Sequence, residues 1–265
     1  MQKTENNLNT NYLNNYDLRK NTNLKIFNFY SFNNILKTEE ELINIKNILI
    51  NCCAQNNILG TILIAKEGFN GQLSSEKDNL NIIYNLLIKM NLDNFNYKFA
   101  DVSFIPFKKL KIKIKPDVIG IGCELKNINS NVGIYINPED WDQEIIKQDA
   151  ILIDTRNEYE FNAGTFKGAI NPNIETFREF PIWVEKNFEK LNLQNKKIYM
   201  FCTGGIRCEK STAFFQEKYN IKTYHLKGGI LDYLYITKNK NNLWIGDCFV
   251  FDDRILVDKQ DYIKN

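Results

Sequence analysis

Apolar and polar positions in the first half of the chain follow the two periods of regular secondary structure. Apolar residues recur every second position in four short segments and every third or fourth position in two longer ones. The expected strands are 23–32, 60–68, 69–75 and 96–104, and the expected helices are 38–56 and 76–90. Because the order β-α-β-β-α-β is that of a ferredoxin-like unit, we predict such a domain over residues 23–120.

A further strand is expected directly after these elements, where lysine and apolar residues alternate. One face of this strand carries Lys109, Lys111, Lys113 and Lys115, and the other face carries Leu110, Ile112 and Ile114. A row of lysines is typical of a surface that contacts the phosphate backbone of a nucleic acid. It is equally typical of an edge strand on which lysines prevent aggregation. The sequence leaves both interpretations open.

The second half of the chain alternates short strand patterns with helical ones. The expected strands are 150–156, 197–202 and 221–229, and the expected helices are 177–188 and 208–219. This alternation predicts a parallel sheet flanked by helices, which we assign to residues 141–240. Functional residues of such sheets lie at the carboxyl ends of the strands. Asp154, Arg156, Cys202 and Gly228 occupy those positions.

Three segments fall outside the two predicted domains. Residues 1–22 are rich in Asn and lack periodicity, which indicates a flexible arm. Residues 121–140 contain Gly122, Gly133 and Pro138, a composition typical of a linker. Residues 241–265 are assigned as a C-terminal extension.

Charge and cysteine content narrow the class of protein. The whole chain of 265 residues has a net charge of +2, but residues 1–120 hold 15 Lys and Arg against 11 Asp and Glu. A nucleic-acid surface is therefore expected in the first half. Six cysteines at irregular spacing do not suggest a disulfide framework. With no signal peptide and no apolar run of about 18–20 residues, we predict a cytoplasmic protein without a membrane partner.

The clearest chemical signal is the segment CTGGIR, which joins an expected strand to an expected helix. It consists of Cys202, Thr203, Gly204, Gly205, Ile206 and Arg207. The two glycines let backbone N–H groups turn toward one point, the helix adds its positive end, and the arginine adds a charge. Such a loop stabilises a thiolate or a terminal persulfide. We therefore predict Cys202 as an exposed nucleophile.

The length of this loop indicates sulfur chemistry. Four residues separate Cys202 from Arg207, whereas phosphatases with a loop of this kind have one more residue to enclose a tetrahedral phosphate. The smaller ring suits a single sulfur atom, and a buried structural thiol is the alternative. Two further residues are candidates for support. Arg156 would orient the loop or receive substrate, and Cys208 would resolve an oxidised Cys202.

Several motifs together resemble a known family. The segments IDTRNEYE, CTGGIRCEK and YHLKGGI resemble a rhodanese domain. Together with GTILIAKEGFNGQL, NPEDW, GTFKGA, FREFP and CFVFDDR, they resemble, in their order along the chain, the rhodanese-containing tRNA uridine hydroxylase family. The resemblance covers roughly residues 23–257.

The resemblance implies an oxidoreductase that modifies tRNA. Members of this family hydroxylate C5 of the wobble uridine with molecular oxygen, and their rhodanese cysteine acts through a persulfide. Carried over to this chain, the catalytic residues are Cys202 and Arg207, and the partners are tRNA and a sulfur donor. With tRNA as partner, the lysine face of the first half becomes a candidate tRNA contact.

The sequence identifies no cofactor beyond molecular oxygen as co-substrate. It has no flavin or nicotinamide fingerprint. It predicts no metal site, because the only histidine, His225, excludes a two-histidine iron centre within one chain.

Two other functions stay open at this level. A plain sulfurtransferase would move sulfur from thiosulfate or a persulfide donor, and the second half alone does not exclude it. A non-catalytic RNA-binding module would use the rhodanese half as a scaffold. The first-half domain and the order of the motifs favour hydroxylation over the former, and the intact Cys202–Arg207 loop argues against the latter.

Overall fold

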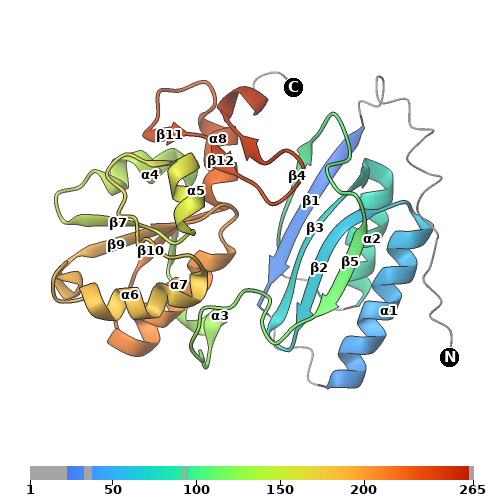
Figure 1. The fold of residues 1–265 in the computed structure, drawn as a ribbon, viewed down its shortest axis with the longest axis horizontal. Helices are drawn as coiled ribbons and strands as arrows, with labels where there is room; N and C mark the ends of the chain where they lie inside the picture. The colour runs from blue at the N-terminus through green and yellow to red at the C-terminus, as the bar shows by residue number, and fades with distance from the viewer. Residues whose placement is uncertain (1–22, 33–37, 91, 93–94, 263–265) are drawn as a thin grey trace. The chain divides into compact units, whose positions relative to one another are not determined.

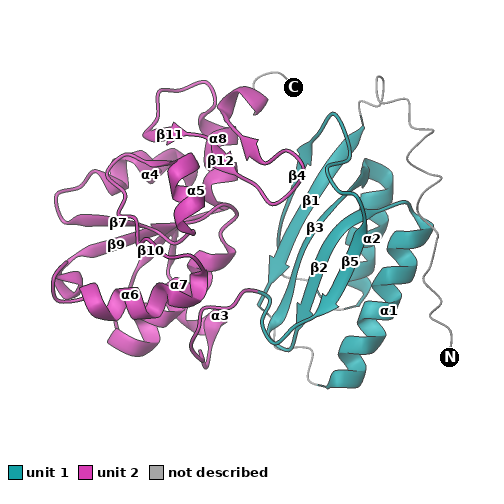
Figure 2. Ribbon diagram, in the orientation of Figure 1, with its two compact units in different colours: residues 1–118 teal, residues 119–265 magenta. Residues whose placement is uncertain are grey.

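The computed structural model describes residues 23–32, 38–90, 92 and 95–262, so the predicted arm at 1–22 lies outside the described residues. The chain divides into two compact units, residues 1–118 and 119–265 (Figure 2). Both units combine helices with a sheet, which confirms the predicted α/β class.

The first unit is the predicted ferredoxin-like domain with one added strand (Figure 1). Its elements are β1 (Leu24–Ser31), α1 (Glu39–Gln55), β2 (Leu59–Ala65), β3 (Gly68–Glu76), α2 (Lys77–Lys89), β4 (Asn96–Asp101) and β5 (Leu110–Ile114). The sheet has the order β4-β1-β3-β2-β5, and only the β2–β5 pair is parallel. Leu49 of α1 and Leu80 of α2 pack with Phe27, Ile62 and Leu73 of the sheet in one core.

The first helix starts where its sequence predicts. Thr38 caps α1, and its Oγ1 accepts a hydrogen bond from the Glu41 N–H at 3.1 Å. The Glu41 carboxylate in turn accepts one from the Thr38 N–H at 2.9 Å. This reciprocal pair satisfies N–H groups that the first turn of a helix otherwise leaves without partners.

The second unit is built on the predicted parallel sheet, with the order β6-β10-β9-β7. Its strands and helices up to residue 237 are α3 (Ile128–Asn131), β6 (Ile134–Ile136), α4 (Pro138–Ile145), β7 (Ala150–Asp154), α5 (Glu158–Ala163), β8 (Gly164–Phe166), η1 (Phe177–Glu179), α6 (Phe180–Asn187), η2 (Leu193–Asn195), β9 (Lys197–Phe201), α7 (Ile206–Tyr219), β10 (Tyr224–Leu226) and α8 (Gly229–Thr237). Across the described residues, no helix has the length and apolar character needed to cross a membrane.

Strand β9 is buried on both faces, as a central strand of a parallel sheet should be. Ile198 and Met200 belong to the core formed with α6 and α7. Tyr199 and Phe201 belong to the core formed with α4 and α8. This double burial fixes the end of β9, from which the CTGGIR loop leaves the sheet.

Residues 121–140, for which glycine content predicted a linker, are part of the second unit. They contain α3, β6 and the start of α4, and β6 is an outer strand of the parallel sheet. The glycines serve close packing. A Cβ at Gly122 would lie 2.1 Å from the backbone oxygen of Arg178, and one at Gly133 would lie 2.5 Å from that of Thr223. Composition alone does not separate this use of glycine from flexibility.

The C-terminal extension also belongs to the second unit. It contains β11 (Trp244–Gly246), β12 (Cys248–Phe249), β13 (Leu256–Val257) and η3 (Lys259–Tyr262). β11 pairs antiparallel with β8, and β12 pairs antiparallel with β13. Next to the β8–β11 pair, the Leu243 carbonyl accepts a hydrogen bond from the Lys167 N–H at 2.8 Å. No pattern in the sequence indicates this pairing.

Candidate active site

Three strand ends of the second unit lie at one edge of its parallel sheet, as the strand–helix alternation predicts. Asp154 ends β7, Cys202 follows β9 and Gly228 follows β10, and these strands are neighbours in the sheet. The first two ends are tied together, because the Thr155 N–H donates to the Phe201 carbonyl at 3.1 Å. The candidate active site is built on this edge.

The Cys202 thiol is buried inside its loop, whereas the sequence predicted an exposed nucleophile. Cys202 is 1% exposed. The Gly205 N–H donates to its Sγ at 3.1 Å, and the backbone N–H groups of Arg207 and Cys208 also hydrogen-bond to it. The sulfur is buried because the N–H groups at the start of α7 converge on it.

The two loop glycines have different roles. Gly205 has a φ of 98°, in the left-handed region, where a side chain would strain the backbone. Gly204 is not among the residues with positive φ, and a Cβ added there would meet no atom within 4 Å. A side chain added at Gly204 would therefore find open space, whereas Gly205 is needed for the backbone conformation of the loop.

The loop lowers the pKa of Cys202. Burial acts to raise this pKa, but the hydrogen bond with the Cys208 thiol, the charge of Arg207 and the backbone N–H groups outweigh it. The resulting pKa is about 6, well below the ordinary value for a cysteine. The thiolate is the nucleophilic form, so Cys202 is mostly in its reactive form at neutral pH.

Arg207 is held by a carboxylate that the sequence reading did not single out. Its Nη1 and Nη2 donate to the two oxygens of Glu160 at 2.6 and 2.8 Å. Both side chains are buried, at 7% and 0% exposure. Burial opposes the ionised form of Glu160, but the charge and hydrogen bonds of Arg207 hold the pKa of this carboxyl below its ordinary value. The pair joins the start of α5 to the start of α7.

A local signal for Glu160 is present in the sequence. Asn157 caps α5, and the Glu160 carboxylate accepts the Asn157 N–H at 3.2 Å in a capping box. The spacing N-x-x-E therefore indicates a helix start, but it does not indicate Arg207 as a partner. Thr203 completes the contact, because its hydroxyl donates to Glu160 at 3.3 Å.

The start of α8 clamps the loop from its other side. The N–H groups of Ile230 and Leu231 donate to the carbonyls of Cys202 and Thr203 at 3.0 and 3.1 Å. Gly229 permits this approach, since a Cβ there would lie 2.5 Å from the Thr203 oxygen. Gly229 of the YHLKGGI segment thus lets the start of α8 position the loop.

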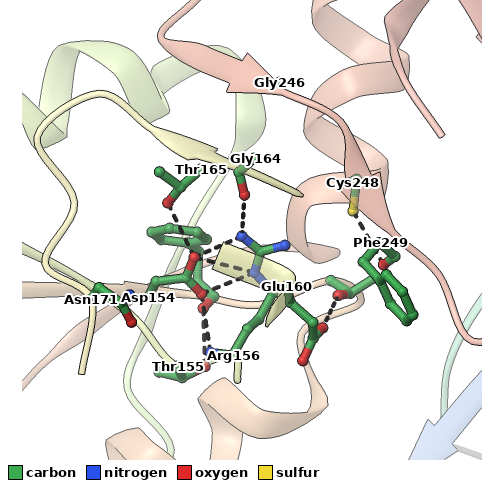
Figure 3. A network of polar contacts seen from close by, with 12 residues as sticks. Asp154, Thr155, Arg156, Glu160, Gly164, Thr165, Asn171, Gly246, Cys248 and Phe249 are labelled. Atoms are coloured by element: carbon green, nitrogen blue, oxygen red, sulfur yellow. Dashed lines mark hydrogen bonds and ion pairs between the residues drawn. The ribbon is translucent and has the colours of Figure 1, made fainter. Parts of the chain in front are cut away.

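Arg156 lies in a group of buried polar contacts that Figure 3 draws together with Glu160. It is fully buried and donates to Asp154 through Nε at 2.9 Å and Nη2 at 2.7 Å. Its Nη2 also donates to the Gly164 carbonyl, and Thr165 donates to Asp154 at 3.1 Å. The network ties the end of β7 to β8. Arg156 thereby supports the edge of the sheet on which the Cys202 loop stands.

The two other buried cysteines near the site differ from Cys202. Cys208 is fully buried beside Thr155, whose Oγ1 lies 3.7 Å from its Sγ. Burial and the hydrogen bond to Cys202 raise the pKa of Cys208 well above its ordinary value. Cys248, to which the sequence assigned no role, is buried on β12 beside the Arg156 network (Figure 3). Burial raises its pKa to about 12.

The structure also places the residues considered for a metal and for RNA. Within the described ranges, no group of three or more His, Cys, Asp or Glu side chains is arranged to hold a metal ion. His225 is buried on β10, with its ring 4.2 Å from that of Tyr135. The four candidate RNA-binding lysines are exposed: Lys111 and Lys113 lie on β5, an edge strand of its sheet, and Lys109 and Lys115 flank it.

Comparison with known proteins identifies both units. Residues 24–118 match the family model of the UPF0176 acylphosphatase like domain, and residues 137–234 match that of the rhodanese-like domain. The chain is thus a rhodanese-like protein with an acylphosphatase-like N-terminal domain. A solved rhodanese-like domain from Anabaena is 18% identical, with 42% of this chain and 78% of that chain covered and a TM-score of 0.34.

Curated relatives define the family more closely. A protein of Rickettsia rickettsii (strain Sheila Smith) named tRNA uridine(34) hydroxylase is 49% identical over 237 residues, which cover 88% of this chain and 93% of the relative. One of Rickettsia prowazekii with the same name is 49% identical over 235 residues, with the same two shares covered. The chain belongs to the tRNA uridine(34) hydroxylase family, as its motifs predict.

Proposed function

We propose that this chain is an oxidoreductase that hydroxylates C5 of the wobble uridine of tRNA, with molecular oxygen as co-substrate. The observation that carries the proposal is the loop around the Cys202 sulfur, in which the Gly205 N–H donates to Sγ at 3.1 Å and the charge of Arg207 helps to lower the pKa of Cys202. Membership in a family whose relatives are named tRNA uridine(34) hydroxylase supports the substrate and the position.

In this reaction, the sulfur of Cys202, as a thiolate or as a persulfide, adds to C6 of the uracil ring. The new C–S bond moves the C5=C6 electron pair onto C5, where the C4 carbonyl stabilises it, and C5 then reacts with oxygen. Departure of the sulfur and loss of the C5 proton restore the ring. The conversion of C5–H and O₂ into C5–OH and water takes up two electrons and two protons, which we assign to a thiol-class reductant. Where Cys202 acts as a persulfide, its outer sulfur comes from a donor that already carries sulfane sulfur, thiosulfate or another persulfide, and sulfite or a thiolate leaves as the new S–S bond forms.

The lysine face of β5 is the surface to which we assign the tRNA backbone. Its lysines are exposed, and they alternate with Ile112, which is 7% exposed and packs in the core. Side chains on one face of a strand repeat about every 7 Å, close to the separation of successive phosphates in RNA. One row can therefore contact several phosphates.

The deciding experiment is nucleoside mass spectrometry of tRNA incubated with the purified protein, a thiol reductant and oxygen-18 gas. We expect 5-hydroxyuridine that carries the heavy oxygen, its loss in Cys202→Ser, and its retention in the control variant Cys123→Ser, which changes an exposed cysteine. Thiouridine in place of 5-hydroxyuridine would establish a sulfurtransferase instead. Full activity of Cys202→Ser would refute the role of this sulfur.

A further inference from the structure

Three aromatic side chains of the second unit are in contact with one another, and two of them are exposed. Tyr159 is 47% exposed and Phe251 is 57% exposed. Phe249 joins them, with its ring centroid 5.0 Å from that of Tyr159 and 5.4 Å from that of Phe251. The interplanar angles are 79° and 75°, so these rings meet edge to face and do not stack on one another. We call these three residues the aromatic platform.

The aromatic platform lies next to the residues that hold the Cys202 loop. Tyr159 directly precedes Glu160, whose carboxylate binds Arg207 at 2.6 Å. Strand β12, which carries Phe249, packs against α5 and β8. Figure 3 shows Phe249 and Cys248 beside the network that includes Glu160. The aromatic platform and the ion pair that holds the Cys202 loop are therefore both attached to α5.

The hairpin that carries Phe251 is held in a strained conformation. Ile255 has a φ of 64°, which a β-branched residue rarely adopts. The turn persists because the Val250 N–H donates to the Ile255 carbonyl at 2.8 Å and Arg254 pairs with Asp252 at 2.6 Å. Strain that the surrounding contacts over-determine is characteristic of functional sites. Phe251 lies in the same hairpin, four residues before Ile255.

We propose that the aromatic platform stacks an unpaired nucleobase of the RNA loop that contains the reacting uridine. This inference rests on the proposed function, since it concerns the same substrate. Single-stranded RNA is commonly held by stacking its bases on aromatic side chains, and every base offers a face for this. Enzymes that modify a base also hold it out of its stack. Within the hairpin turn, the Arg254 guanidinium binds the Asp252 carboxylate through Nε at 2.8 Å and Nη2 at 2.6 Å.

The test compares two stem-loop RNAs, one with a complete uridine-containing loop and one in which a loop nucleotide lacks its base. Binding to the full-length protein is measured by fluorescence anisotropy. We expect Tyr159→Ala and Phe251→Ala each to weaken binding of the complete loop by about tenfold. Neither substitution should change binding of the RNA in which the loop nucleotide lacks its base. Tyr159→Phe and Phe251→Trp keep a ring and should bind like the unaltered protein. Tyr235→Ala is the control, since it removes a tyrosine of α8 that is 51% exposed.

Three results would overturn the platform. The first is unchanged binding in both alanine variants, and the second is an equal loss of binding in Tyr235→Ala. The third is a loss that accompanies altered self-association, which would indicate a protein contact at Phe251. The rate of Cys202 alkylation is measured alongside, because an unchanged rate shows that the loop is intact in Tyr159→Ala. Failure of hydroxylation by the unaltered protein would refute the proposed function, whereas base-dependent binding tests the platform independently.

Discussion

Both oxygens of the Glu160 carboxylate bind the guanidinium of Arg207, so the arginine of the Cys202 loop is one half of a buried ion pair. The Glu160 carboxylate thus offsets part of the positive charge that Arg207 presents to the Cys202 sulfur. The pKa of Cys202 nevertheless falls to about 6, because the Cys208 thiol and the backbone N–H groups contribute alongside the arginine. The pair has two effects that can be separated by substitution, one on folding and one on the thiolate.

Arg207→Ala is expected to destabilise the protein strongly, because it leaves the Glu160 carboxylate buried without its counter-charge. The loss in free energy of unfolding should be about 3–5 kcal/mol. Arg207→Lys should recover only part of it, since an ammonium cannot make the two-point contact. Urea denaturation followed by circular dichroism measures both losses. The double variant Arg207→Met, Glu160→Gln should be more stable than Arg207→Ala, and an equally unstable double variant would contradict the buried-charge explanation.

The reactivity of Cys202 is expected to rise with pH around a midpoint near 6. Below that pH the sulfur is a neutral thiol, and above it the reactive thiolate predominates. In the double variant Arg207→Met, Glu160→Gln, the midpoint should move to higher pH, since Arg207 lowers the pKa of Cys202. Iodoacetamide alkylation of peptides containing Cys202 is followed by mass spectrometry, in a Cys123→Ser background that removes an exposed thiol. An unmoved midpoint would mean that the N–H groups and Cys208 alone set this pKa.

Two glycine substitutions should have opposite outcomes. Gly229→Ala places a Cβ 2.5 Å from the Thr203 oxygen at a φ of 68°, so it should lower the melting temperature and slow Cys202 alkylation. Gly204→Ala meets no atom within 4 Å, so its melting temperature should stay close to that of the unaltered protein. Differential scanning calorimetry measures both. Equal losses would show that the clamp by α8 does not depend on the close approach at Gly229.

Neutralising the lysine face should weaken tRNA binding in a salt-dependent manner. Each lost phosphate contact changes the slope of log affinity against log salt by about 0.7–0.9. Lys111→Gln with Lys113→Gln should therefore flatten this slope by up to twice that amount. The control is Lys77→Gln with Lys89→Gln, which removes the same charge from exposed positions on α2. If both pairs have the same slope, the lysines of β5 serve only to protect an edge strand.

The sequence by itself determined the local elements and the position of the Cys202 loop between a strand and a helix. Strand and helix periods, the cap at Thr38 and the CTGGIR segment between β9 and α7 depend on residues that are close together along the chain. These patterns can be recognised without knowledge of the fold, because a helix cap or a glycine turn is formed by residues that are adjacent along the chain. The motif order likewise sufficed to place the chain in its family.

Only the tertiary structure decided which distant side chains meet. Glu160 and Arg207 are 47 positions apart, and their contact requires α5 and α7 to pack at one edge of the parallel sheet. The burial of Cys202, the exposure of the β5 lysines and the contact of Tyr159 with Phe249 depend on packing in the same way. Packing is set by the simultaneous burial of apolar faces over a whole unit, so no short segment of sequence specifies the partner of a given side chain.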